Sequence, residues 1–361
     1  MKRIIAIALL CICLAGCSFG SAEYYSATAH KVKDQKPNET IPAVSNYNEL
    51  YDAVAAIVEK GALMGRMSVD GYRSVSLENN LEFVKQDIMK NHPIGAYAVD
   101  SIEFELGTAV GMNAVSVTVK YSREPEELQS IKPAKDMEKA KALIRDALNQ
   151  YDSALVMRVE NYQDADLVQY IEDFAAENPD VVMENPTVTV AVYPESGADR
   201  VVDIRFAYRT SRESLRQMQK YVQPVFTSAS LYVSSEEEGD IIKYARLYTF
   251  LMERNAYKVE TSLTPAYSLL RHGVGDNRAF ATVYAAMCRK AGLECLVVTG
   301  TRNGDARCWN IIRDGDYYYH VDLLSPSGFI LYKDQQLTGY VWDYSAYPVC
   351  GVPQQPEKTE E

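Results

Sequence analysis

Histidine and tryptophan are scarce in this chain of 361 residues, which has four of the first and two of the second. The histidines are scattered, and no two of the four cysteines after residue 17 are spaced as zinc ligands usually are. Structural zinc sites draw four such ligands from short, characteristic spacings. We therefore expect neither a metal site nor a cofactor.

Positive charge is also in short supply, because 37 Lys and Arg face 49 Asp and Glu and give a formal net charge of −12. Loss of Lys2 and Arg3 with a leader peptide would make the mature chain two units more negative. Such a chain is not expected to bind nucleic acid, or to hold an anionic lipid or polymer by charge. Its 47% hydrophobic and 24% charged residues are typical of a globular protein with two or three domains.

The apolar run that opens the chain, residues 4–14, is too short to cross a bilayer. It follows Lys2-Arg3 and precedes small residues, which predicts a secretory signal peptide at residues 1–16. The tetrad Leu14-Ala15-Gly16-Cys17 resembles a bacterial lipobox. This implies cleavage before Cys17, acylation of its thiol (palmitate or a similar chain) and an extracytoplasmic lipoprotein anchored to the bacterial cell membrane. A plain signal peptide or a short anchor is the alternative.

Two segments show no hydrophobic periodicity. Residues 17–44 are rich in Ser, Lys, Pro and Asn, which predicts a flexible tether. Residues 353–361 are predicted to form a disordered tail. The folded part of the protein is expected between them.

A weak internal repeat occupies the first half of this folded part. The order helix, strand, helix and two strands is predicted twice, as related α+β units at residues 45–135 and 136–225. Chance similarity between any two α+β segments is the alternative. The predicted helices are 46–59, 77–91, 136–151 and 167–178, and the predicted strands are 62–69, 97–106, 114–121, 154–159, 187–193 and 200–208.

The stretch between residues 273 and 322 carries the most specific pattern in the chain. Two glycines precede an apolar helix, and a tripeptide of small and apolar residues closes it. The residues are Gly273, Gly275 and Asn277 at the start, Phe280 and Ala281 within, and Ala291-Gly292-Leu293 at the end. This pattern resembles the core of the transglutaminase-like superfamily. The resemblance implies a papain-like α+β domain, predicted at residues 236–352, with helices at 240–254 and 263–271 before the core.

The catalytic triad of that superfamily is degenerate here. Asn277 stands at the position of the nucleophilic Cys, Arg307 at that of the general base, and only the acid remains, as Asp322. Asn has no ionisable nucleophile and is a good helix cap, and a guanidinium cannot accept a proton. No catalytic residue is therefore expected, and the chain is predicted to be a pseudoenzyme.

The dipeptide Asp314-Gly315 predicts a tight turn between two strands of a hairpin, one containing Arg307 and the other leading to Asp322. As the central pair of the turn, it places Arg307 opposite Asp322 and Trp309 opposite His320. All four side chains then share one face of the hairpin. A cross-strand ion pair between Arg307 and Asp322 is expected.

Four cysteines remain after the signal and the lipidated residue, and an even number in an exported protein permits disulfides. They are Cys288, Cys295, Cys308 and Cys350. A turn at Asn303-Gly304 places Cys308 opposite Thr299, about 13 Å along the strands from Cys295, which is beyond disulfide reach. The Cys295–Cys308 pair is disfavoured, and the other pairings stay open.

Two binding hypotheses remain open. The substrate groove can persist as a peptide or cell-wall binding surface or scaffold, with Trp309 and His320 as candidate groove residues beside Asn277. Alternatively, Arg307 and Asp322 only stabilise the domain, and recognition lies in the N-terminal units. The tyrosines at 317–319, together with Trp342 and Tyr344, could form a platform for a sugar, although ordinary sheet packing explains them as well.

The enzymatic alternative is a cysteine acyltransferase or peptidase with a relocated thiol. Cys288 lies about 16 Å along the helix from Asn277. Cys308 faces away from Asp322, and no thiol can be placed beside His320. The sequence therefore favours the inactive interpretation.

Overall fold

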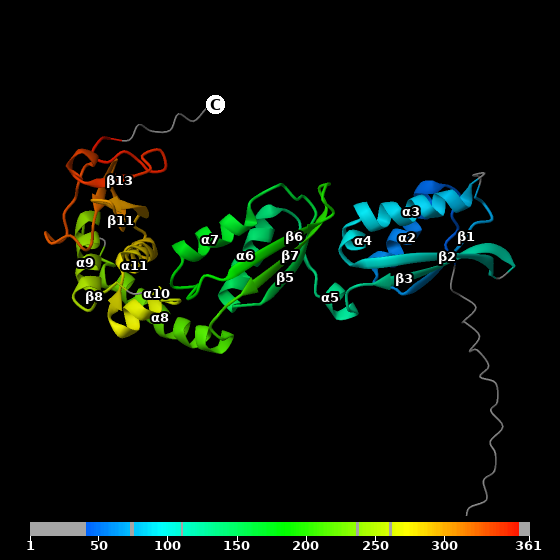
Figure 1. The fold of residues 1–361 in the computed structure, drawn as a ribbon, viewed down its shortest axis with the longest axis horizontal. Coiled ribbons are helices and arrows are strands. Elements are labelled where there is room, and N and C mark those ends of the chain that lie inside the picture. Colours follow the sequence, from blue (N-terminus) through cyan, green and yellow to red (C-terminus); the bar gives the residue numbers. More distant parts are fainter. Residues whose placement is uncertain (1–40, 73–75, 110, 236–237, 260–261, 354–361) are drawn as a thin grey trace, which may run out of the picture.

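The computed structural model describes residues 41–353, except for 73–75, 110, 236–237 and 260–261. The predicted signal peptide, the lipobox with Cys17, most of the predicted tether and the tail after Pro353 lie outside the described residues. Three bodies follow one another along the longest axis (Figure 1). Within the described ranges, no helix has the length and apolar character needed to cross a membrane.

The first body is a three-stranded antiparallel sheet with helices over one face (Figure 1). Its elements are α2 (Tyr47–Glu59), β1 (Met64–Ser68), α3 (Leu77–Asn91), α4 (Pro93–Ala98), β2 (Val99–Ala109), β3 (Met112–Tyr121) and α5 (Pro125–Gln129). Asn46 caps α2 by accepting a hydrogen bond from the Glu49 N–H. Leu50, Val54 and Val58 recur at every fourth position and face the core.

The folded region begins earlier than predicted. Ala43 forms a bridge with Ser68, and the Val44 N–H donates to the Ser68 carbonyl at 2.9 Å. The Val44 side chain is buried in the core of the first unit. The prediction of a tether as far as residue 44 is therefore wrong for these last residues, because burial of an apolar side chain stabilises their packing.

The second body contains β4 (Lys132–Ala134), α6 (Met137–Gln150), β5 (Ala154–Val159), α7 (Leu167–Glu177), β6 (Thr187–Tyr193) and β7 (Arg200–Ala207). Its strand order is β4-β5-β7-β6, and that of the first body is β1-β3-β2. If the edge strand β4 is set aside, each sheet has three strands, and the last of them in the chain (β3 or β7) lies between the other two. This common topology agrees with the predicted duplication, and the unit boundaries stay a prediction.

A long helix that the sequence analysis did not assign, α8 (Arg212–Tyr232), joins the second unit to the C-terminal domain. Its buried residues Leu215, Val222 and Phe226 belong to the core of that domain. The predicted boundary at residue 225 thus falls inside one continuous helix. The remaining elements are α9 (Asp240–Met252), β8 (Ala256–Tyr257), α10 (Pro265–His272), β9 (Val274–Gly275), α11 (Asn277–Lys290), β10 (Cys295–Arg302), β11 (Asp305–Asp314), β12 (Tyr317–Val321), the 3-10 helix η1 (Asp334–Gln336) and β13 (Tyr340–Trp342).

The C-terminal domain packs α11 against a four-stranded antiparallel sheet of order β12-β11-β10-β13. Asn310 of β11 faces the helix, because its side-chain amide donates to the Ala281 carbonyl at 2.9 Å. Trp309 and Ile311 alternate to the opposite face and form a second, smaller core there. The predicted α+β class is confirmed, and this sheet positions the site.

The predicted register of the second hairpin is wrong by two residues. Asp314 pairs with Tyr317, and Ile311 rather than Trp309 pairs with His320. Gly315 has φ +57° and takes the first central position of the turn, as type II′ geometry requires. A shift of two residues leaves each side chain on its predicted face.

Candidate functional site

The N-terminus of α11 carries the first of the three triad positions. Asp276 caps the helix by accepting a hydrogen bond from the Ala279 N–H at 2.8 Å. A Cβ on Gly275 would lie 3.1 Å from Ala279 Cβ and 3.1 Å from Leu269 Cδ1, so the chain passes close to the helix here. Because Asp276 is the cap, the Asn277 side chain is left for other contacts.

The Asn277 amide is used inside the domain. Its Oδ1 accepts a hydrogen bond from the Cys308 backbone N–H at 3.1 Å. Its Nδ2 donates to the Ala306 carbonyl at 3.4 Å. These two partners flank Arg307, so Asn277 ties the start of α11 to β11 at the second triad position.

Arg307 and Asp322 form the expected ion pair, in a bidentate arrangement. Arg307 Nη2 lies 2.7 Å from Asp322 Oδ1, and Nε lies 3.1 Å from Oδ2. The Asp322 side chain is 2% exposed and that of Arg307 is 13% exposed. Since a buried charge without a partner is costly, the guanidinium is the main compensation for this carboxylate.

Two side chains that the sequence analysis did not single out hold the same carboxylate. The Tyr340 hydroxyl donates to Asp322 Oδ2 at 2.6 Å, and an Arg302 guanidinium nitrogen lies 3.7 Å away. The Leu324 backbone N–H donates to Oδ1 at 3.0 Å. Burial, and then the Asp322 charge, raise the pKa of the Tyr340 hydroxyl well above its ordinary value. This phenol therefore stays a hydrogen-bond donor.

The three triad positions are thus joined into one network. Asn277 offers neither thiol nor hydroxyl, and Arg307 has no lone pair with which to accept a proton. The network connects α11, β11 and the segment after β12. Its contacts hold these parts of the domain together.

The prediction that Trp309 and His320 line a groove is wrong, because both side chains are 0% exposed. Trp309 Nε1 donates to His320 Nδ1 at 3.0 Å. The ring of Trp342 packs edge-on against both. Strand β13, which carries Trp342, pairs with β10 and covers this face of the sheet.

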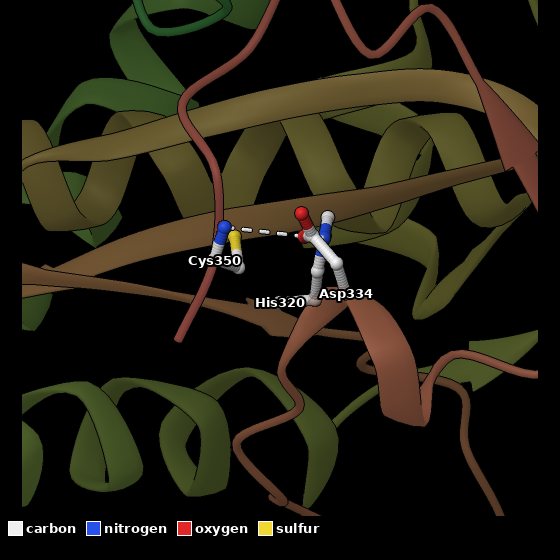
Figure 2. A group of neighbouring side chains, drawn as sticks. All are labelled: His320, Asp334 and Cys350. Atoms are coloured by element: carbon white, nitrogen blue, oxygen red, sulfur yellow. Dashed lines mark hydrogen bonds and ion pairs between the residues drawn. The ribbon is translucent and has the colours of Figure 1, made fainter. Parts of the chain in front are cut away.

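Figure 2 shows a cluster that the sequence analysis missed, formed by His320, Asp334 and Cys350. His320 Nε2 lies 2.9 Å from Asp334 Oδ1, to which the Cys350 backbone N–H also donates at 3.2 Å. The ring nitrogen, the carboxylate oxygen and the sulfur lie within 4.8 Å of one another. The expectation that no thiol lies beside His320 is therefore wrong. The return of the chain after η1 brings Cys350 there, and no local sequence pattern specifies where such a return ends.

The cluster offers nitrogen, oxygen and sulfur, all of which can bind Zn²⁺. An indole N–H only donates, so His320 Nδ1 must accept from Trp309 and the ring proton sits on Nε2. That proton is donated to Asp334, and no lone pair on Nε2 faces a metal. As arranged, the cluster is a hydrogen-bonded connection between β12 and the C-terminal segment.

The register of the first hairpin is as predicted, since Thr299 pairs with Cys308 and Cys295 pairs with Ile312. This geometry confirms that Cys295 and Cys308 are not disulfide partners. All four cysteines of the described chain are free and buried.

Burial also governs the reactivity of these thiols. It raises the pKa of Cys288 and of Cys308 above the ordinary thiol value. The pKa of Cys350 is raised further by the Asp334 carboxylate in addition to burial. Since the thiolate is the nucleophile, these shifts oppose reactivity at neutral pH.

Comparisons with known proteins confirm the resemblance. Residues 228–323 match the model of the transglutaminase-like superfamily. No match was found among curated proteins.

Three solved structures are similar to this chain at low sequence identity. A TGase has 10% identity and a TM-score of 0.27 over 70% of this chain and 71% of that chain. A "putative cysteine protease" from Cytophaga hutchinsonii has 14% identity and a TM-score of 0.26 over 40% and 65%. A "putative protease" from Parabacteroides distasonis has 11% identity and a TM-score of 0.24 over 62% and 48%. This chain covers less than two thirds of the length of the last two proteins. Similarities with TM-scores this low carry no functional argument.

Proposed function

We propose that the transglutaminase-like domain at residues 228–323 is catalytically inactive and serves as a binding or scaffolding module. One observation carries the proposal: the nucleophile and base positions hold Asn277 and Arg307, and both side chains are engaged inside the domain. Acyl transfer by this superfamily's chemistry needs a thiolate and a proton acceptor. Neither is available at these positions.

The proposed location is the outer side of a bacterial cell membrane. The lipobox-like tetrad that ends in Cys17 supports an acyl anchor, and the acidic composition excludes charge as the main attachment. A peptide or a cell-wall segment is the proposed class of ligand. Nucleic acid is not a proposed partner.

Of the two binding hypotheses, the geometry favours the one in which the Arg307–Asp322 pair stabilises the domain. Both groups of the Asn277 amide are bonded to the backbone of β11, and the ion pair is nearly inaccessible. A ligand would have to break these contacts in order to use them. Recognition is therefore proposed to lie away from the triad positions.

The test is to rebuild the triad in the full chain purified in a non-ionic detergent. The variant Asn277→Cys with Arg307→His supplies a thiol at the start of α11 and an imidazole near Asp322. The matched control, Asn277→Ser with Arg307→Lys, changes the same positions without supplying a thiol or a neutral base. Amine incorporation into a glutamine peptide and amide hydrolysis are measured for all three proteins.

The natural chain and the Ser/Lys control should show no turnover above buffer, and the Cys/His variant should gain turnover that a thiol reagent abolishes. Turnover by the natural chain would overturn the proposal. Unfolding curves of the three proteins establish that each is folded under the assay conditions.

A relocated thiol is the second candidate, and the cluster in Figure 2 is the observation that favours it. Among the described cysteines, Cys350 is the one placed beside both a histidine and a carboxylate. Its thiol is buried and its pKa is raised, and the His320 proton is committed to Asp334. Natural turnover that disappears in Cys350→Ser would establish this candidate instead.

A further inference from the structure

A cavity of about 420 Å³ lies between the second unit and the C-terminal domain. Helix α7 and the segments after it form one wall, and α10 with the first turns of α11 forms the other. Figure 1 shows α7 reaching toward α10 and α11, and α7 lies against α11. The volume is within the usual range for sites that hold small molecules. Asn277, Arg307 and Asp322 are not part of the lining.

Direct contacts join the two walls. Lys290, at the end of α11, forms an ion pair with Asp180 of the second unit at 3.1 Å. Met183 of the second unit is buried in the core of the C-terminal domain together with Phe226 of α8. These contacts hold the second unit against the C-terminal domain beside the cavity.

At the cavity, the carboxylates have hydrogen-bond donors from the protein, whereas two arginines have no carboxylate partner in the described part of the chain. The Glu184 carboxylate is buried and accepts hydrogen bonds from the Arg209 and Thr210 backbone N–H groups at 2.6 and 3.1 Å. The Asp276 carboxylate caps α11. Arg209 and Arg278 also line the cavity, one from each wall, and neither guanidinium has a carboxylate within 4 Å in the described part of the chain.

The rest of the lining is mainly small and apolar. Alanines contribute from α7, β7, α10 and α11, including Ala176 and Ala279. Such walls accommodate short aliphatic groups. A guanidinium binds a carboxylate in a bidentate manner and adds specificity as well as affinity.

From these features, we propose that the cavity binds a small molecule with a carboxylate head and a short aliphatic body, as at the C-terminal end of a short peptide. Arg209 and Arg278 bind the carboxylate, and the alanine-rich walls receive the aliphatic part. This site goes beyond the proposed function, because it does not depend on whether the triad positions are active.

The test is a calorimetric titration of the full chain in non-ionic detergent with N-acetyl-Ala-Ala-Ala as the free acid. The C-terminal amide of the same peptide and inorganic phosphate are the comparison probes. The variants are Arg209→Gln with Arg278→Gln, and Ala176→Trp, which obstructs the cavity from an exposed helix position without changing charge. The matched control is Arg66→Gln, which removes an exposed arginine from the first unit. All these positions are exposed, and urea unfolding checks that each variant is folded.

The free acid is expected to bind at least tenfold more tightly than the amide or phosphate. The double Gln variant and Ala176→Trp should each weaken acid binding at least tenfold, and Arg66→Gln should leave it unchanged. The triad variant Asn277→Cys with Arg307→His should also bind normally, which separates this result from the test of inactivity. Equal binding of acid and amide, phosphate as tight as the acid, unchanged binding in the double Gln variant, or no binding by the folded natural chain would each overturn the proposal.

Discussion

Asp322 is a single acidic residue on which several contacts of the fold converge. Its carboxylate is buried and accepts hydrogen bonds from Arg307, Tyr340 and the Leu324 backbone. Strands β11 and β13 and the segment after β12 therefore meet at one charge. Removal of a partner should lower the free energy of unfolding, and the loss should be larger for a partner that compensates more of the charge.

Arg307→Ala is expected to lower the free energy of unfolding by about 3–5 kcal/mol, because it leaves the buried Asp322 carboxylate without its main partner. Arg302→Ala is the matched control, since its side chain is 36% exposed and its guanidinium lies 3.7 Å from the carboxylate. It should cost less than about 1 kcal/mol. Urea unfolding followed by circular dichroism measures both. Equal losses would contradict the assigned role of Arg307.

His320 should make stability depend on pH. Burial lowers its pKa, and Asp334 opposes part of that shift. The unfolded histidine, with a pKa of about 6.5, binds a proton more readily than the folded one. The contribution of neutral His320 is therefore complete above about pH 6.5 and is lost as the pH falls from there through the folded-state pKa.

Urea unfolding of the natural chain and of His320→Gln at pH 7.5, 6.5 and 5.5 tests this expectation. The natural chain should lose more stability than the variant over this interval, because Gln does not titrate. Parallel losses in the two proteins would show that other groups cause the dependence.

The sequence predicted the Arg307–Asp322 pair although the register was wrong by two residues. Side chains alternate with a period of two, so both registers place these residues on one face. The roles of Tyr340 and Cys350 could not be predicted in the same way. Both reach the site through irregular segments, and no periodicity specifies where those segments return.

Strand β13 lies close to β10 at Gly300. A Cβ there would lie 2.2 Å from the Val341 carbonyl oxygen and 2.8 Å from Trp309 Cη2. Glycine is thus required for β13 to cover Trp309. This approach also brings Tyr340 to Asp322.

Gly300→Ala is expected to destabilise the chain by about 1–3 kcal/mol, because the added methyl group must displace β13 or the indole. Gly107→Ala in β2 is the control, since a Cβ there meets nothing within 4 Å. That substitution should change stability by less than about 0.5 kcal/mol. Denaturant midpoints of the two variants provide the comparison, and a neutral Gly300→Ala would contradict the close approach.

Helix α3 was predicted with both ends correct, as were strands β5 and β6, because each has a continuous local pattern of apolar residues. Helix α8 was not predicted. It contains Pro224, which cannot donate a backbone hydrogen bond inside a helix. Its apolar side chains pack into the C-terminal core, so tertiary contacts rather than local preference stabilise it.

For the whole molecule, α8 is the structural link between the second unit and the transglutaminase-like domain. It begins at the second unit and ends in the core of the C-terminal domain, and the proposed ligand cavity lies between these two bodies. The second unit therefore contributes one wall of the proposed site. The proposed binding in this cavity does not require catalysis.

The most direct test of the central claim is turnover by the natural full chain, measured as amine incorporation and amide hydrolysis over a panel of glutamine-containing and alanine-rich peptides. The absence of a nucleophile at Asn277 and of a base at Arg307 predicts no turnover above that of buffer, and no change on substitution of any of Cys288, Cys295, Cys308 or Cys350 by Ser. Turnover that one of these four substitutions abolishes would show that the chain is a cysteine enzyme and would contradict the claim.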